Sequence, residues 1–192
     1  MKTLNFSKRK LAVRSVVLII LSVVLSFFTW FLLGNSTFKG NEEDYVSLRL
    51  TDDNLLENAG DYDDAYFQLY TNRMLIFYSE ASLLKLDYTQ ENYNSQIEYI
   101  NHNYSFLTEP VVDDFDNSYI ISENEFQIGN WHFKVCADGE YPKEFRIIGL
   151  NDSENAIAYI DFSDSDLDYL CEEFEPMEEC FIDEYVGYDF RD

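Results

Sequence analysis

Glycine and proline are scarce in this sequence, with seven and three residues among 192. Their scarcity excludes low-complexity and collagen-like chains, and no internal repeat is visible. The chain instead carries 15 tyrosines and 16 phenylalanines. Because disordered segments are poor in aromatic residues, this content predicts a folded core, and the length suits a single domain.

The motifs of common enzyme classes are missing. The sequence has no H-E-x-x-H, no G-x-S-x-G, no Walker loop and no G-x-G-x-x-G. Its two histidines, His102 and His132, do not combine with cysteines in a zinc-site spacing. Two carboxylates could serve a glycosidase, but among 37 acidic residues such a pair arises by chance and carries no information. The sequence therefore favours a protein that is not an enzyme.

Cysteine occurs only three times, at Cys136, Cys171 and Cys180. In an exported domain Cys171 and Cys180 could form a disulfide across a short loop, leaving Cys136 free in an apolar strand. Three unpaired thiols are an equally good interpretation. The sequence leaves both open.

Acidic residues are absent before Glu42, whereas all 37 follow from there on. Five basic residues stand in the first 14 positions. From position 34 to the end, eight basic residues against 37 acidic ones give a net charge of −29. This charge argues against nucleic acid or anionic lipid as a partner of this part of the chain, because phosphates would be repelled. It suits an exported domain that meets cations or basic surfaces, although solubility alone would also explain it.

A single long apolar run, residues 15–33, is present, so a multi-span channel or transporter is not expected. The run SVVLIILSVVLSFFTWFLL carries no charge. As a helix it would span about 28 Å, close to the bilayer core of about 30 Å. The basic residues before it predict a cytoplasmic N-terminus. The alternative is a cleaved signal peptide, but those have shorter apolar cores and a small-residue cleavage site that is poorly matched here.

The sequence therefore predicts a single-pass cell-membrane protein with its C-terminal domain outside. The four expected parts are a basic cytoplasmic segment at 1–14, a transmembrane signal-anchor helix at 15–33, a tether at 34–44 and an acidic exported α+β domain at 45–192.

Within the domain, hydrophobic spacing predicts an antiparallel sheet packed against one main helix. The clearest helix covers residues 89–107, where apolar residues recur every three or four positions after a Thr89 N-cap. Alternation predicts a strand at 45–50, two strands within 65–88 with their turn near Ser79, and several strands within 117–162.

The sharpest local pattern is a run of acids that resembles part of a calcium-binding loop. The acids fall at positions 1, 3, 5, 9 and 12 of the twelve-residue EF-hand loop. Position 6, which needs glycine, is Tyr169, and a strand rather than a helix is expected upstream, so a formal EF-hand is disfavoured. A looser surface calcium site stays a weak candidate beside a plain solvated turn. The five residues are Asp164, Asp166, Asp168, Glu172 and Glu175.

The function expected from these observations is an anchored, exported domain that binds a partner without transforming it. One alternative is an accessory subunit of a membrane complex, recruited through the helix itself. A less favoured alternative is an anchored hydrolase that uses carboxylates. The expected partners are the lipid bilayer, through residues 15–33, and a protein; no cofactor is expected beyond the candidate calcium ion.

Thermal melts test the calcium hypothesis. Crowded carboxylates repel one another, so salt should raise the melting midpoint by screening. A specific site adds to this, because an ion that binds only the folded state stabilises it. We expect millimolar calcium to raise the midpoint more than sodium chloride of equal ionic strength, and Asp166→Asn with Asp168→Asn to remove the difference. Equal midpoints for the two salts would mean that there is no site.

Overall fold

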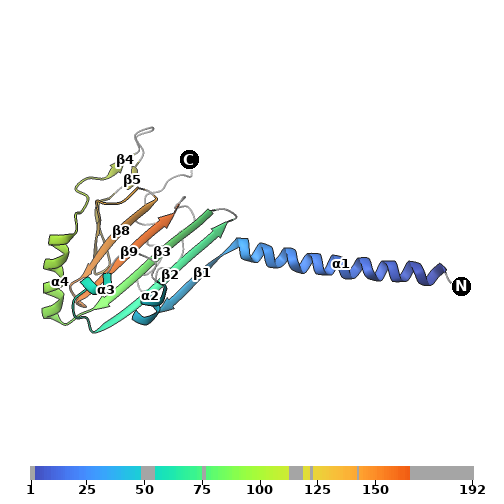
Figure 1. Cartoon of the computed structure of the whole chain (residues 1–192). Coiled ribbons are helices and arrows are strands. Elements are labelled where there is room, and N and C mark those ends of the chain that lie inside the picture. Colours follow the sequence, from blue (N-terminus) through green and yellow to red (C-terminus); the bar gives the residue numbers. More distant parts are fainter. Residues whose placement is uncertain are drawn as a thin grey trace.

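The computed structural model describes residues 3–48, 55–74, 77–112, 119–121, 123–141 and 143–164. Within these residues a seven-stranded antiparallel sheet forms the body of the domain, and short helices accompany it (Figure 1). The expected α+β architecture of sheet and helices is confirmed.

The strands of the main sheet, in spatial order, are β1 (Leu33–Gly40), β2 (Asp64–Met74), β3 (Phe77–Asp87), β9 (Ala156–Asp164), β8 (Glu144–Asn151), β7 (Trp131–Val135) and β6 (Glu125–Ile128). β4 (Val111–Val112) and β5 (Tyr119–Ile121) pair with each other. The helices are α1 (Thr3–Leu32), α2 (Glu42–Leu48), α3 (Leu55–Asn58) and α4 (Gln90–Asn103).

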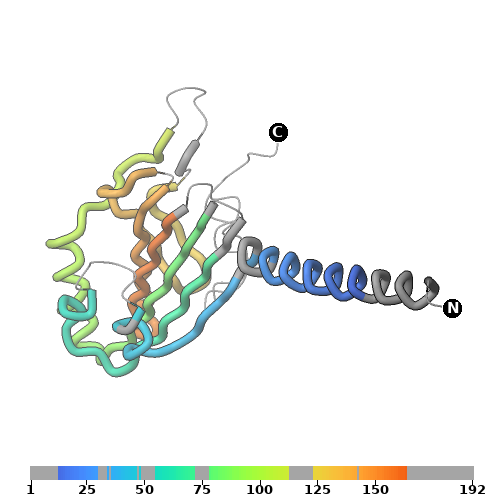
Figure 2. Tube along the Cα trace, turned by 45° about the vertical axis from the view of Figure 1, so that its right-hand side comes forward, coloured from blue at the N-terminus to red at the C-terminus, as the bar shows by residue number. Residues whose placement is uncertain are grey.

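The main sheet consists of two antiparallel meanders that meet in its middle. β1, β2 and β3 form one meander, and β6, β7, β8 and β9 form the other. β9 returns to pair with β3, from Ser79 opposite Asp164 to Asp87 opposite Ala156. Figure 2 follows this path, in which the chain between β3 and β9 passes through α4 and the second meander before closing the sheet.

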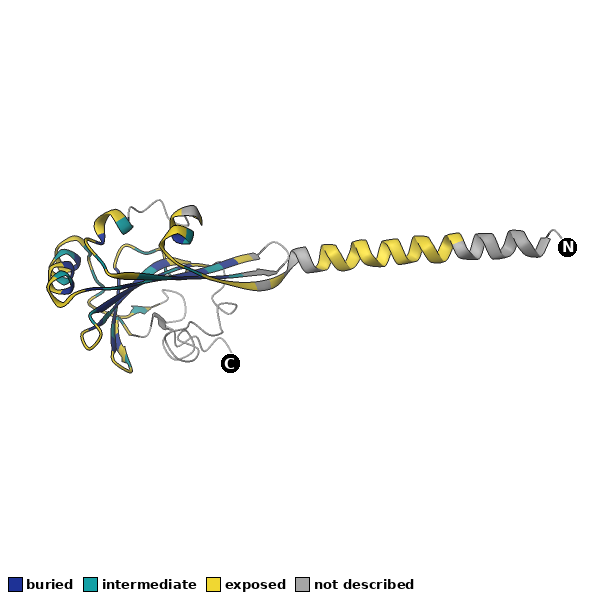
Figure 3. Cartoon of the chain, turned by 90° about the horizontal axis from the view of Figure 1, so that it is seen from below, coloured by how far each residue is buried: buried dark blue, intermediate teal, exposed yellow. Residues whose placement is uncertain are grey.

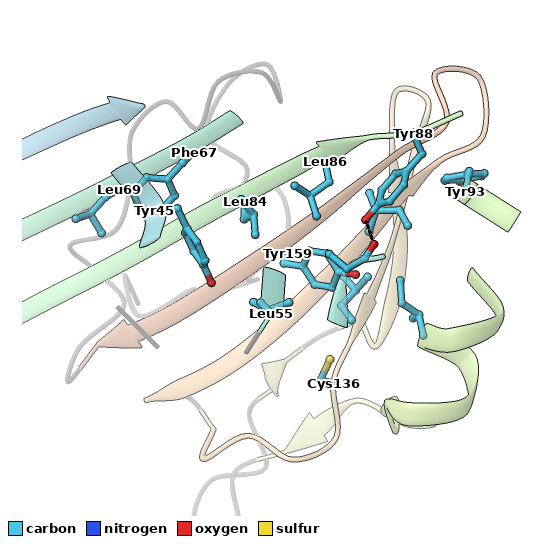
Figure 4. Packing of buried hydrophobic residues seen from close by; sticks show 14 residues of the cluster. Tyr45, Leu55, Phe67, Leu69, Leu84, Leu86, Tyr88, Tyr93, Cys136 and Tyr159 are labelled. Carbon is cyan, nitrogen blue, oxygen red and sulfur yellow. Dashed lines mark hydrogen bonds between the residues drawn. The ribbon is translucent and has the colours of Figure 1, made fainter. Parts of the chain in front are cut away.

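Alternation along the strands gives the sheet two buried faces. On β3, Leu83 belongs to the hydrophobic cluster of one face, whereas Leu84 and Leu86 belong to that of the other. Side chains from the helices pack on the second face, which is drawn in Figure 4; they are Tyr45 from α2, Leu55 from α3, and Tyr93 and Ile100 from α4. The first face is rich in stacked aromatic rings, such as Phe126 on Phe133, with ring centroids 5.0 Å apart.

The helix expected at 89–107 is present as α4, and its N-cap is as predicted. The Thr89 hydroxyl accepts a hydrogen bond from the backbone N–H of Asn92 at 3.3 Å. The helix ends at Asn103, earlier than expected, because the next residues pair with the sheet. The N–H of Leu107 donates to the carbonyl of Val135 at 2.9 Å, so the apolar spacing at Leu107 serves a strand contact.

The strand predicted at 45–50 is wrong, since residues 42–48 form α2. Asn41 caps this helix: its side-chain oxygen accepts from the N–H groups of Glu43 and Asp44, and the Asp44 carboxylate accepts from the Asn41 N–H. This reciprocal capping outweighs the period-2 pattern. Tyr45 then packs edge-on against Phe67, with ring centroids 5.2 Å apart.

The tether predicted at 34–44 is also wrong, because residues 33–40 form the edge strand β1. Every residue of β1 has a partner on β2, from Leu33 opposite Met74 to Gly40 opposite Phe67. Gly40 and Asn41 then turn the chain directly into α2. A Cβ on Gly40 would lie 2.4 Å from the Asp44 carboxylate, so this tight turn requires glycine.

The two strands predicted within 65–88 are confirmed as β2 and β3. Ser79 lies inside β3 and not at the turn, because Phe77 already pairs with Met74. The antiparallel strands expected within 117–162 are confirmed as well, including the alternating burial of β7.

Helix α1 projects away from the sheet, and its described side chains, from residue 13 to residue 29, are all exposed (Figure 3). Across the parts of the chain that the structure describes, no helix is long and apolar enough to cross a membrane.

Gly149 offers a test of how side chains pack within the second meander. It lies opposite Phe133 in the β7–β8 ladder, and an added Cβ would lie 2.4 Å from a carbon of the Phe133 ring. That ring is fully buried against Phe126 and Trp131 and has no room to move. We expect Gly149→Ala to lower the free energy of unfolding by about 1–3 kcal/mol, measured by urea denaturation.

Gly129→Ala is the matched control. Nothing lies within 4 Å of the added Cβ there, and only the positive φ of 58° opposes it. We expect a loss of about 1 kcal/mol from the backbone alone. A Gly149→Ala loss no larger than that of the control would contradict the packing described here.

Candidate functional site

Two regions of the described structure hold groups that could take part in chemistry or in binding. One is a polar cluster between α4 and the sheet, where any chemistry would have buried groups to use. The other is the open edge of β1 with the start of α2.

The polar cluster is centred on an ion pair between neighbouring strands. Arg146 on β8 and Asp161 on β9 are register partners, so their side chains emerge on the same face. The Arg146 guanidinium donates twice, with Nε 2.5 Å from Oδ1 and Nη2 3.1 Å from Oδ2 of Asp161. Both side chains are mostly buried, at 14% and 20% exposure. Such a bidentate pair fixes register between strands and neutralises both charges.

Tyrosine hydroxyls of the same hydrophobic cluster link the helices and the neighbouring loops to the sheet. Gln96 of α4 donates its amide to the hydroxyl of Tyr159 and to the carbonyl of Asn58, each at 3.1 Å. The Tyr88 hydroxyl donates to the carbonyl of Ala59 at 3.0 Å, and that of Tyr93 donates to Asp152 at 2.7 Å. Burial raises the pKa of all three hydroxyls, so they keep their protons at neutral pH.

Cys136 is the described thiol of this region, and it is a free, fully buried side chain, as expected for an apolar strand. Its N–H donates to the carbonyl of Arg146 at 2.9 Å. Burial raises the pKa of the thiol to about 12, and the nearby Asp138 carboxylate acts in the same direction. A thiol that keeps its proton and is closed to solvent is neither a nucleophile nor a metal ligand. The cluster thus supplies hydrogen bonds that hold α4 on the sheet.

The two histidines lie on separate elements. His102 is exposed on the last turn of α4, in keeping with the expectation of a solvated side chain. His132 on β7 contacts Glu125 on β6, with Nε2 2.6 Å from Oε1, and both side chains are about half exposed. Neither histidine belongs to the buried cluster.

Of the five residues of the candidate calcium site, the structure describes only Asp164. Asp164 ends β9 opposite Ser79, and the other four residues, Asp166, Asp168, Glu172 and Glu175, lie outside the described residues, as do Cys171 and Cys180. Among the residues that are described, no three His, Cys, Asp or Glu side chains are grouped closely enough to hold a metal ion. The calcium site stays a prediction.

The second region is the outer edge of β1. β1 ends the main sheet, and no strand among the described residues pairs with its far side. Its residues Ser36, Thr37 and Phe38 are exposed. Among the described residues no strand lies beyond Ser36, Thr37 and Phe38 on this side, and a further strand could be added there through backbone hydrogen bonds.

Acidic residues stand beside this edge. Glu42 and Glu43 are exposed in the first turn of α2, immediately after β1 turns at Gly40. Val46 and Leu48 of the same helix are 48% and 41% exposed, and Phe38 on β1 is 42% exposed. The region therefore combines an open backbone edge, a small apolar surface and two carboxylates.

Comparison with known proteins does not identify this arrangement. No protein-family model, no curated protein and no solved structure matches the chain. The function must therefore be argued from the geometry.

Sequence reasoning missed the β1 edge. The segment LGNSTFKG contains glycine, serine and asparagine, which favour loops, and Phe38 is its one large apolar residue after Leu33. The lack of acids gave no signal for this segment either, because acids are absent from all of residues 1–41.

Alkylation tests the assignment of Cys136 as an inert core thiol. The unfolded chain releases the proton near pH 9, whereas the folded protein holds it up to about 12, so this thiol's contribution to stability is lost as pH rises from about 9 to about 12. We expect iodoacetamide at pH 8 to leave Cys136 unmodified in native protein and to modify it in urea, as mapped by mass spectrometry. Rapid native modification would show that the thiol is accessible.

Proposed function

We propose that this protein is a single-pass, membrane-anchored binding protein whose acidic α+β domain, outside the cell, receives an extended basic segment of another protein on the edge of β1. The observation that carries the proposal is that an exposed apolar helix runs without a linker into an open edge strand.

The anchor part of the proposal is supported by sequence and by exposure. The described side chains of α1, from Val13 to Thr29, are all exposed, and they include the greater part of the uncharged run at 15–33. A helix with apolar side chains on every side is more stable in lipid than in water, because in lipid those side chains are removed from water. The basic residues that precede it favour a cytoplasmic N-terminus.

The choice of an extended segment as the partner follows from the β1 edge. A strand added beside Ser36 to Phe38 would extend the sheet through backbone hydrogen bonds. The choice of basic side chains follows from charge: the chain after position 33 carries a net −29, and Glu42 and Glu43 flank the edge. Such complementarity speeds association and excludes acidic partners.

A second copy of this chain fits the edge less well. In a symmetric antiparallel pair of β1 strands, the two N-terminal ends would lie at opposite ends of the pair. Since α1 leads directly into β1, the two α1 helices would leave the joint sheet in opposite directions. Copies anchored in one bilayer could not pair in that way.

Photo-crosslinking tests this function in intact cells. A photoreactive amino acid at position 37, on the exposed part of β1, should yield a discrete adduct, whereas the same group at position 154 should not. Glu154 is exposed in the turn between β8 and β9 and serves as the matched site. We expect Glu42→Lys with Glu43→Lys to abolish the adduct at position 37, because the new charges repel a basic segment.

Glu91→Lys is the control for that charge reversal. Glu91 is likewise exposed in the first turn of a helix. Its change to lysine therefore opposes the helix dipole in the same way, but in α4 and away from the β1 edge. It should leave the adduct intact. An adduct that persists after the reversal at Glu42 and Glu43, or that appears equally at position 154, would contradict β1 as the binding edge.

The accessory-subunit alternative is favoured by the exposed apolar side chains of α1, which could contact other helices. Replacing residues 15–32 with an unrelated apolar anchor separates the two functions. The adduct survives if the domain alone binds, and it disappears if α1 recruits the partner. Protease added to intact cells checks the topology, because the domain should be cut without lysis.

A further inference from the structure

Side chains of β1 alternate between the two faces of the main sheet, so its edge offers a partner two different surfaces. Phe38 is the register partner of Leu69, which belongs to the hydrophobic cluster on the face that carries α2. Thr37 is the partner of Tyr70, which belongs to the cluster on the other side of the sheet. We call these the α2 face and the opposite face.

On the α2 face the edge carries a large apolar side chain. Phe38 is 42% exposed, and its ring centroid lies 6.4 Å from that of the fully buried Phe67. Figure 4 shows Phe67 beside Leu69 and Tyr45 within the cluster on this face. Phe38 therefore continues the buried cluster outward to the edge of the sheet, where its ring is only partly covered.

The neighbours of Phe38 on the α2 face limit this apolar surface. Ser36, two residues earlier, is polar, and its hydroxyl oxygen lies 2.8 Å from that of Thr71. Gly40, two residues later, has no side chain, and an added Cβ would clash with Asp44 of α2. A strand added to β1 would place one of its own side chains beside Phe38, because cross-strand neighbours on one face have Cβ atoms about 4.5–5.5 Å apart.

The opposite face has a different character. Thr37 and Lys39 are exposed there. A basic side chain of a partner placed beside Lys39 would be repelled, because like charges across neighbouring strands are destabilising. The carboxylates of Glu42 and Glu43 follow only after β1 has turned at Gly40. Positive charge on a partner is therefore favoured beyond the end of β1 and disfavoured beside its middle.

We propose that the β1 edge selects an extended segment whose uncharged middle places a bulky apolar side chain beside Phe38 and whose basic residues lie at the end next to α2. This inference rests on the proposed function and adds to it the pattern of the partner's side chains. The apolar side chain would remove the exposed part of the Phe38 ring from water. The basic residues then supply attraction, and the apolar residue supplies selectivity among basic segments.

Defined peptides test this pattern with the full chain in a zwitterionic detergent. The photoreactive amino acid stands at position 37 and each peptide carries biotin, so the yield of adduct at rising peptide concentration gives an apparent Kd. The peptide KKTITITKK has its isoleucines on one face and lysines at both ends, so it can bind in either strand direction. KKTSTSTKK lacks the isoleucines, and EETITITEE carries the opposite charge. We expect KKTITITKK to bind about five- to tenfold more tightly than KKTSTSTKK, and EETITITEE not to bind.

Phe38→Ser should remove this preference, so that the two lysine peptides bind equally. A general loosening of β1 would instead weaken both peptides by the same factor, so the ratio of their Kd values isolates the contact with Phe38. Phe38→Ile keeps an apolar side chain suited to a strand and should keep most of the preference. Val112→Ser is the matched control, because Val112 is likewise exposed, at 43%, but lies on β4 in the other sheet. It should leave the ratio unchanged.

The outcomes separate this inference from the proposed function. If the lysine peptides bind equally to the unchanged chain and Glu42→Lys with Glu43→Lys abolishes both adducts, the binding of basic segments stands and selection by Phe38 is refuted. A ratio that persists in Phe38→Ser refutes it as well. If EETITITEE binds as tightly as KKTITITKK, or if no peptide forms an adduct at position 37, the proposed function itself fails and the inference falls with it.

Discussion

The pairing of β9 with β3 is the interaction on which the rest of this structure depends. Each meander alone is a small sheet with exposed sides, and the ladder from Ser79 opposite Asp164 to Asp87 opposite Ala156 joins them. Only in the joined sheet do Leu83 and Leu84, neighbours on β3, both become buried on opposite faces. The β3–β9 ladder closes a long loop of the chain, which costs conformational entropy. The burial of side chains on both faces of the joined sheet offsets that cost.

The buried polar groups belong to this joining. The Arg146–Asp161 pair lies between β8 and β9, and the Gln96–Tyr159 bond ties α4 to β9. Groups that hold their protons near neutral pH, such as Cys136 and Tyr159, suit a fixed interior and not acid–base chemistry. These groups are therefore part of the packing that holds the strands and α4 together.

Charge is unevenly distributed along the edge strand. β1 contains no acid, and at Gly40 and Asn41 it turns into the first turn of α2, where Glu42 and Glu43 are exposed. A basic segment added to this edge would therefore meet carboxylates at one end of the strand, which gives its positive charges a defined place.

The local sequence determined those helices and strands that depend on neighbouring residues. The Thr89 cap, the alternation of β7 and the two strands around residue 76 could all be predicted, since each depends on neighbouring residues. The tertiary structure decided those elements that depend on residues distant in the sequence. Residues 34–44 look like a tether, but β2 supplies hydrogen bonds to 33–40 and makes them a strand. Residues 45–50 alternate like a strand, but the Asn41 cap and the contact of Tyr45 with Phe67 favour a helix over 42–48. The open edge, and with it the candidate site, exists only because a distant strand pairs with β1 on one side.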